Sequence, residues 1–249
     1  MKRALLLFAV LWASLSPAQT VLQHFIAVSK GGIDVSDMDI GTTSEGSVII
    51  AMPLQLSPGV KVLSVTDNAP TGSNIYKQIP ASTASCDKLD MEIWYCEKCA
   101  AGVTELKFHL SGPPRASLNA LVEVSGLALP AVLDGQGTHL EDGTRTSKGE
   151  EVGPVIKTTM ADFIIARYHS DFPIPKAVTP DPWQYRTSYV YIPNAPAGSY
   201  QPTLSGGEGK SGKYCMSAAA FKVAPPAPSA PATSAPQAPP SNPAPTPQN

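Results

Sequence analysis

Residues 88–112 constrain the fold more than any other stretch, because apolar and polar side chains alternate there with a period of two. The apolar positions are Leu89, Met91, Ile93, Tyr95, Leu106, Phe108 and Leu110. Successive strand residues point to opposite faces, so the pattern predicts two strands, each with one buried and one solvated face. We expect the two arms to form one β-hairpin around a turn at Ala100, Ala101 and Gly102. Pro113 and Pro114 would end it, because proline lacks the N–H that strand pairing requires.

Short segments of strand character recur along the chain, at residues 21–28, 47–54, 60–66, 74–79, 117–124, 162–169, 186–192, 199–204 and 213–222. Turns separate them, and the chain contains 19 Gly and 26 Pro, as expected for many short strands. No window combines the apolar spacing of a helix with helix-capping residues. The sequence therefore predicts an all-β, two-sheet antiparallel β-sandwich, Ig-like or jelly-roll-like in strand order, with little helix. Residues 125–154 are expected to be mainly loop.

A weak internal echo links two parts of the chain. Tyr95 and Gly102 are separated by six residues, and so are Tyr191 and Gly198, and each pair precedes a Leu-Ser-Gly sequence. This recurrence suggests that the two halves use the same hairpin.

The two ends of the chain differ from its middle. Residues 1–18 contain Lys2 and Arg3, a short apolar run and a small-residue cleavage site ending at Ala18, which predicts a signal peptide. We therefore expect a secreted, periplasmic or cell-surface protein, cleaved near Ala18. No later stretch reaches the roughly 20 apolar residues of a transmembrane segment. Residues 19–223 are expected to form the β-sandwich domain, and residues 224–249, rich in Pro and Ala and without charge, a disordered tail.

The charge balance argues against two classes of partner. Lys and Arg number 18 and Asp and Glu number 20, with no block of like charge. A nucleic-acid groove or an anionic membrane surface needs a basic patch, so we expect neither partner.

The four cysteines, Cys86, Cys96, Cys99 and Cys215, predict disulfides in an exported chain. A Cys86–Cys96 bridge is excluded, because an extended strand between them spans about 30 Å and a bridge requires Cα atoms within about 7 Å. Two schemes remain: Cys96–Cys99 with Cys86–Cys215, or Cys86–Cys99 with Cys96–Cys215. We prefer the first, because Cys99 also lies beyond the far end of that strand. Two alternatives exist for Cys96 and Cys99. A redox dithiol would need a helix that starts at the first cysteine, and a zinc site would need a second pair of ligands, and the sequence offers neither.

Catalytic and metal-binding motifs give no positive signal. The sequence has no G-x-S-x-G, H-E-x-x-H or G-x-G-x-x-G motif, and we expect no catalytic residue, metal or cofactor. Asp34, Asp37 and Asp39 are close in sequence but lack the glycine and glutamate of an EF-hand, so a solvated acidic loop is the better interpretation.

Three aromatic residues are the candidate ligand-binding residues. Trp94 is on the polar face of its predicted strand, and Trp183 and Tyr185 border a proline-rich segment. Exposed aromatic rings stack on sugars or accept partner side chains. The alternative, which we favour, is that the indole rings pack inside the fold.

A set of short motifs resembles a known group of proteins. These motifs are VTDN at 65–68, EIWY at 92–95, AG at 101–102, EVSGL at 123–127 and LD at 133–134. In their order, over roughly residues 47–223, the chain resembles a group of poorly characterised bacterial exported β-sandwich domains. The resemblance implies an envelope or surface module and supplies no catalytic residues.

The sequence as a whole favours an exported, non-catalytic envelope or extracellular module for adhesion or for binding a glycan or a protein. A purely structural module and a secreted hydrolase without a recognisable motif are the alternatives. Exposed indole rings would support binding, buried ones a structural role, and a histidine beside a carboxylate and a serine a hydrolase.

Overall fold

The computed structural model describes residues 20–86, 89–134, 138–144, 150–170, 177–179, 182–205 and 213–225. The predicted signal peptide and nearly all of the predicted tail lie outside these residues. The described chain from Thr20 to Ala224 belongs to one compact unit. Strands make up almost all of its regular structure, and one 3-10 turn, η1 (Pro80–Ser82), is the single described helical element. The all-β, antiparallel class with little helix is confirmed.

The first half of the chain forms two antiparallel sheets. The first inner sheet runs β1–β11–β3–β9–β6, with the short strands β4, β8 and β7 continuing it alongside β11. Its strands are β1 (Thr20–Lys30), β3 (Ser47–Met52), β4 (Leu54–Gln55), β6 (Tyr76–Gln78), β7 (Ala84–Cys86), β8 (Leu89–Met91), β9 (Trp94–Cys96) and β11 (Ala116–Ser125). The first outer sheet runs β2 (Val35–Asp39), β10 (Glu105–Leu110), β5 (Val62–Asp67).

The second half repeats this plan. The second inner sheet runs β12 (Thr138–Thr144), β21 (Lys213–Lys222), β15 (Asp162–Ser170), β18 (Tyr189–Ala195), β17 (Gln184–Arg186). Two small outer sheets run β13 (Glu150–Val152), β20 (Thr203–Ser205), β16 (Ala177–Thr179) and β14 (Ile156–Thr158), β19 (Gly198–Tyr200). The segment expected to be mainly loop at 125–154 therefore contains β12 and β13.

Both halves have the same strand order. In the first inner sheet, the first strand β1 pairs with the last strand β11, which also pairs with β3. In the second inner sheet, β12, β21 and β15 have the same arrangement. In each outer sheet the second strand, β2 or β13, lies beside the penultimate, β10 or β20. The chain thus contains two copies of one structural repeat.

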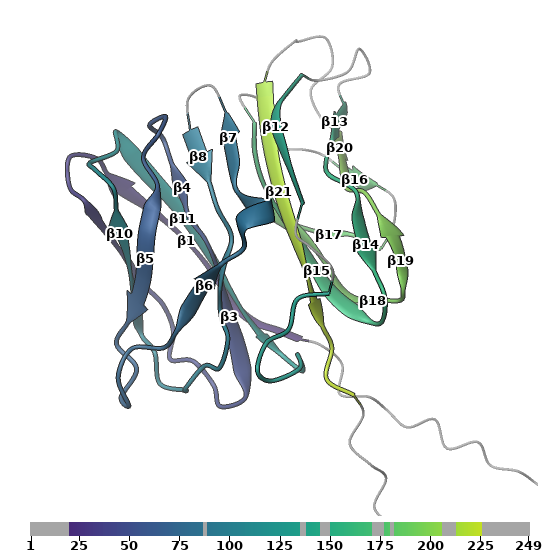
Figure 1. Ribbon diagram of the computed structural model, residues 1–249, viewed down its shortest axis with the longest axis horizontal. Coiled ribbons are helices and arrows are strands. Elements are labelled where there is room, and N and C mark those ends of the chain that lie inside the picture. The colour runs from purple at the N-terminus through teal and green to yellow at the C-terminus, as the bar shows by residue number, and fades with distance from the viewer. Residues whose placement is uncertain are drawn as a thin grey trace, which may run out of the picture. The chain divides into compact units, whose positions relative to one another are not determined.

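The two inner sheets pack face to face, with an outer sheet on the far side of each (Figure 1). All six residues of β3 are buried as a result. Val48, Ile50 and Met52 contact the second half, whereas Ile49 and Ala51 face the first outer sheet. The sequence analysis predicted two sheets, and the structure has more. The alternating pattern does not reveal that both faces of a strand are covered.

The predicted hairpin at residues 88–112 is wrong. β9 pairs with β3 and β6 in the inner sheet, whereas β10 pairs with β2 and β5 in the outer sheet. The chain crosses between layers at the Cys96–Cys99 turn. The repeated motif after Tyr191 makes the same crossing, from β18 in the inner sheet to β19 and β20 in the outer sheets.

The expected solvated face of the first arm is also buried. Asp90, Glu92 and Trp94 are 2%, 1% and 7% exposed. Glu92 accepts hydrogen bonds from the Val62 N–H at 3.0 Å and the Trp94 Nε1–H at 2.7 Å, so its carboxylate stays partnered away from water. Burial raises the Glu92 pKa, although these hydrogen bonds oppose the rise.

The disulfide pairing that we preferred is present. Cys86–Cys215 joins β7 of the first half to β21 of the second, with Cα atoms 6.3 Å apart, and Cys96–Cys99 closes the crossing turn at 5.5 Å. Elsewhere in the same interface, the Tyr95 and Phe221 rings meet edge to face, with ring centroids 5.4 Å apart. The two halves are therefore held together by a covalent bond and by an apolar core.

Removal of the long-range bridge should cost more stability than removal of the short one. Cys86 and Cys215 are 129 residues apart, whereas Cys96 and Cys99 are three apart. The chain-entropy treatment gives a loss of about 5 kcal/mol for C86S/C215S and about 2 kcal/mol for C96S/C99S. Guanidinium titration of both double variants measures the difference, and equal losses would contradict the role of the first bridge as the clamp between halves.

Candidate functional site

The aromatic residues singled out in the sequence do not form a surface platform. Trp94 and Trp183 are each 7% exposed and Tyr185 is half-buried. Trp94 packs between the first inner and outer sheets, and Trp183 and Tyr185 pack in the core of the second half. The strand face that carries Trp94 was expected to be polar and solvated, but a second sheet covers it. The packing alternative describes both indole rings.

Two carboxyl groups meet where the two halves join. Asp134, on the connection between halves, accepts hydrogen bonds from the Thr159 backbone N–H, from Thr159 Oγ1 at 2.6 Å and from the Met160 N–H at 3.2 Å. Asp162, at the start of β15, is fully buried, and neither of its oxygens receives a hydrogen bond from an N–H or a hydroxyl group. The neighbouring carboxyl group of Asp134 is one of the groups that raise the Asp162 pKa.

The pKa values of this pair are pushed apart. Burial, and then the hydrogen bond and charge of Asp134, raise the pKa of Asp162 to about 7. Burial alone would also raise the Asp134 pKa, but the hydrogen bonds from Thr159, Asp162 and Met160 outweigh it and the net pKa falls. Such a pair could exchange a proton, but Asp162 has no exposed surface with which to reach a substrate. We therefore assign it a structural role.

The carboxyl pair predicts a pH dependence of stability. The side chain of an unfolded aspartate has a pKa of about 3.9, so between about pH 4 and 7 Asp162 binds more protons in the folded than in the unfolded protein. The stabilisation that protonated Asp162 provides is therefore lost as the pH rises through this range. In D162N the asparagine keeps a donor for Asp134 and this loss disappears. Melting temperatures from pH 4 to 8 should therefore diverge in favour of D162N. D37N, on the exposed face of β2, serves as the control and should follow the wild type.

A buried arginine bridges the two halves near the same interface. Arg167 is fully buried, donates from Nη1 to the Ser188 carbonyl at 2.6 Å and from Nη2 to the Leu118 carbonyl of the first half at 3.1 Å. Burial lowers its pKa to about 10, which leaves it charged at neutral pH. These hydrogen bonds to backbone carbonyl groups link β15 of the second half to β11 of the first.

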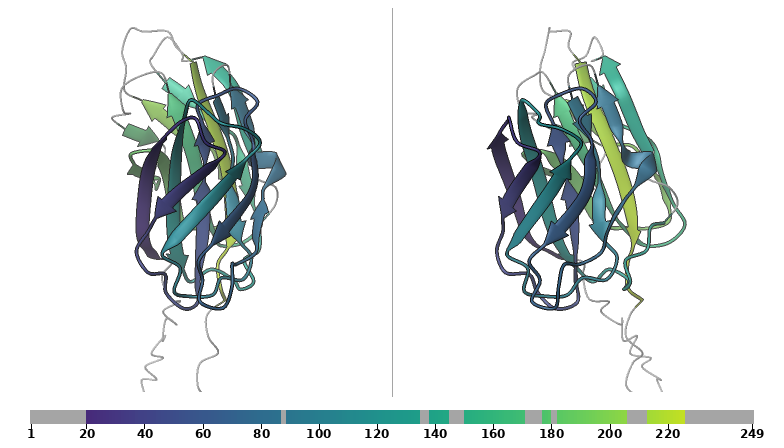
Figure 2. Two further views of the ribbon diagram at one scale, coloured as in Figure 1. Left: turned by 90° about the vertical axis from the view of Figure 1, so that its left-hand side faces the viewer. Right: turned by 60° about the vertical axis from the view of Figure 1, so that its left-hand side comes forward.

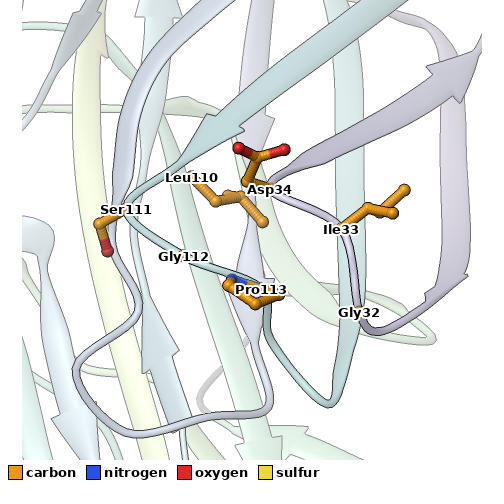
Figure 3. A pocket seen from close by; sticks show the side chains of 7 residues that line it. All are labelled: Gly32, Ile33, Asp34, Leu110, Ser111, Gly112 and Pro113. Atoms are coloured by element: carbon orange, nitrogen blue, oxygen red, sulfur yellow. The ribbon is translucent and has the colours of Figure 1, made fainter.

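Two of the pockets on the described surface lie next to loops. One, of about 370 Å³, lies between the β1–β2 and β10–β11 loops (Figure 3). It is lined by Gly32, Ile33, Asp34, Leu110, Ser111, Gly112 and Pro113. The other, of about 390 Å³, lies beside the Cys96–Cys99 turn and is lined by Ile75, Glu97, Lys98 and Pro130. Each offers few charged groups, and neither contains one of the sequence-predicted aromatic residues.

Strand β1 carries the most distinctive exposed surface. Its residues alternate between exposed and half-buried, and the exposed row includes Leu22, Ile26 and Val28, at 43%, 38% and 74%. The half-buried row includes Phe25 and Ala27, which pack on the core beneath the first outer sheet. β1 pairs with β11 on one side, and no other described strand pairs with it. Figure 2 shows β1, in dark purple, at the margin of the sheet.

This edge differs from the other sheet edges. β1 has 11 residues, whereas every other edge strand described has at most seven. It contains no acidic residue and no proline, and its one lysine, Lys30, is at its end. Proteins usually shorten, bend or charge such edges, because unpaired backbone groups recruit further strands. One register shift, at Leu22, interrupts β1 and leaves residues 23–30 regular.

The sequence predicts this strand but does not predict its place at the edge of the sheet. Residues 21–28 were expected to be a strand, and β1 confirms it. Its place at an edge was missed, because sheet order depends on which distant segments pair. A signal was present in the sequence, since apolar residues occupy both of its faces and acidic residues are absent.

Among the residues that the structure describes, no group of three or more His, Cys, Asp and Glu side chains is arranged to hold a metal ion. His109 shares a hydrogen bond with Thr66 on the outer sheet at 2.9 Å. No helix in the described part of the chain is long and apolar enough to cross a bilayer.

Comparisons with known proteins found no matching family model, no matching curated protein and no matching solved structure. The candidate site is therefore defined by its geometry, as the unpaired edge of β1.

Proposed function

We propose that the protein is an exported, non-catalytic envelope or extracellular module that binds a protein partner by strand addition to β1. The observation that carries this proposal is the long outer edge of β1, with which no other described strand pairs, and its row of exposed apolar side chains. Backbone N–H and C=O groups at such an edge supply affinity, and the alternating side chains supply specificity.

The structure of the remaining body suits this role. β1 pairs with β11 along nearly its whole length, so its edge is held in an extended shape before a partner arrives. Two disulfides also fit an oxidising compartment outside the cytoplasm. A protein partner is favoured over a glycan because Trp94 and Trp183, the rings best suited to stack on sugars, are buried.

Retention on envelope material tests the proposal. The probe is the washed envelope fraction of bacteria that produce the protein. Purified wild-type protein should be retained, and I26K should not, because a lysine in the middle of the exposed row opposes pairing with an apolar strand. L63K is the matched control, since Leu63 is 65% exposed on β5, away from β1.

A second arm separates a protein partner from a glycan. Digestion of the envelope fraction with protease before the assay should abolish retention. Full retention after digestion, or equal retention of I26K and the wild type, would rule out binding by strand addition at β1.

A further inference from the structure

We propose that the partner that pairs with β1 is a second copy of this chain, with the two β1 strands antiparallel across a two-fold axis at Ile26. This inference depends on the proposed function, because it names the partner of the same edge. The first inner sheet would then continue from one copy into the other. A two-fold arrangement is self-complementary and closes after two copies.

The alternation of β1 limits the possible registers. Only a register in which the two residue numbers of each pair add up to an even number places exposed residues opposite exposed residues. An odd sum would set the exposed row of one copy against the half-buried row of the other. Centring on Gln23 or His24 would bring the register shift at Leu22 within two residues of the axis, so three even registers with extensive overlap remain, centred on Phe25, Ile26 and Ala27.

Regularity and charge select among these three registers. Centring on Ala27 sets Lys30 opposite His24, two basic side chains on the same face. Centring on Phe25 takes the outer pairs through the register shift at Leu22. Centring on Ile26 pairs residues 23–29 with each other entirely within the regular part of β1.

The selected register also gives favourable side-chain neighbours. Ile26 lies opposite its own symmetry mate, and His24 lies opposite Val28. Lys30 lies beyond these regular pairs, where its ammonium group can reach water. On the other face Phe25 lies opposite Ala27, a large residue beside a small one. Thus Ile26 and Val28 leave water without bringing like charges together.

Disulfide trapping of the full exported protein tests the register directly. All four native cysteines are in disulfides, so an introduced cysteine supplies the one unpaired thiol. Directly opposite residues of antiparallel strands have Cα atoms about 4.5–5.5 Å apart, within the range of a disulfide. Under mild oxidation I26C should form a covalent dimer on the order of tenfold faster than V28C, whose symmetry mates lie four positions out of register.

The same experiment has a control away from the strand. L63C places an exposed thiol on β5 and should cross-link as slowly as V28C. Equal rates for I26C, V28C and L63C would overturn the inference. Faster cross-linking of V28C than of I26C would also overturn it, because the strands would then meet in another register.

Light scattering after size exclusion adds a measurement without cross-linking. Wild-type protein and L63K should shift toward twice the monomer mass as concentration rises, whereas I26K should stay monomeric, because two lysines would face each other at the axis. A monomeric wild type over the whole concentration range would contradict a second copy as the partner.

Envelopes from bacteria that lack the protein distinguish this inference from the proposed function. If a second copy is the partner, wild-type protein is not retained on them. Retention there that I26K abolishes would keep strand addition at β1 as the function and would overturn the identity of the partner.

Discussion

The burial of one apolar sheet face against another, at the contact between the two inner sheets, supports the rest of the structure. Each half supplies aromatic and β-branched side chains to this contact, including the edge-to-face pair Tyr95 and Phe221. Because each inner sheet has an outer sheet on its far side, its central strands have no solvated face. Apolar burial on both faces is the main favourable term available to a chain with almost no helix.

This arrangement also buries carboxylate groups, two of which have nearby hydrogen-bond donors. Glu123 is 1% exposed and accepts hydrogen bonds from the Ser44 N–H and Ser47 Oγ–H, each at 2.6 Å. Asp90, 2% exposed, receives the Gly59 N–H at 2.6 Å and an ion pair from Lys61. A buried carboxylate that lost these partners would cost several kcal/mol, on the order expected for an unpaired buried charge. The polar residues that alternate with the core are therefore part of the interior.

The repeat explains why one edge is left open. In the second half, β12 lies against β7 and η1 of the first half, so this first strand is backed by the other repeat. Its counterpart β1 lies at the opposite end of the first inner sheet and keeps Val28 at 74% exposure. Equivalent strands in a duplicated fold thus have different surroundings, and the less covered one is where we place partner binding.

The sequence by itself determined the all-β class, most of the extended segments and the preferred pairing of the cysteines. Those properties depend on local alternation and on chain lengths that forbid other bridges, as the buried Leu106, Phe108 and Leu110 illustrate. The tertiary structure alone decided that β9 and β10 belong to different sheets, that Trp94 and Glu92 are interior, and that β1 is an edge. Alternation reports two faces of a strand but carries no information on how many layers cover them or which distant strand lies alongside, because those depend on contacts between residues far apart in the chain.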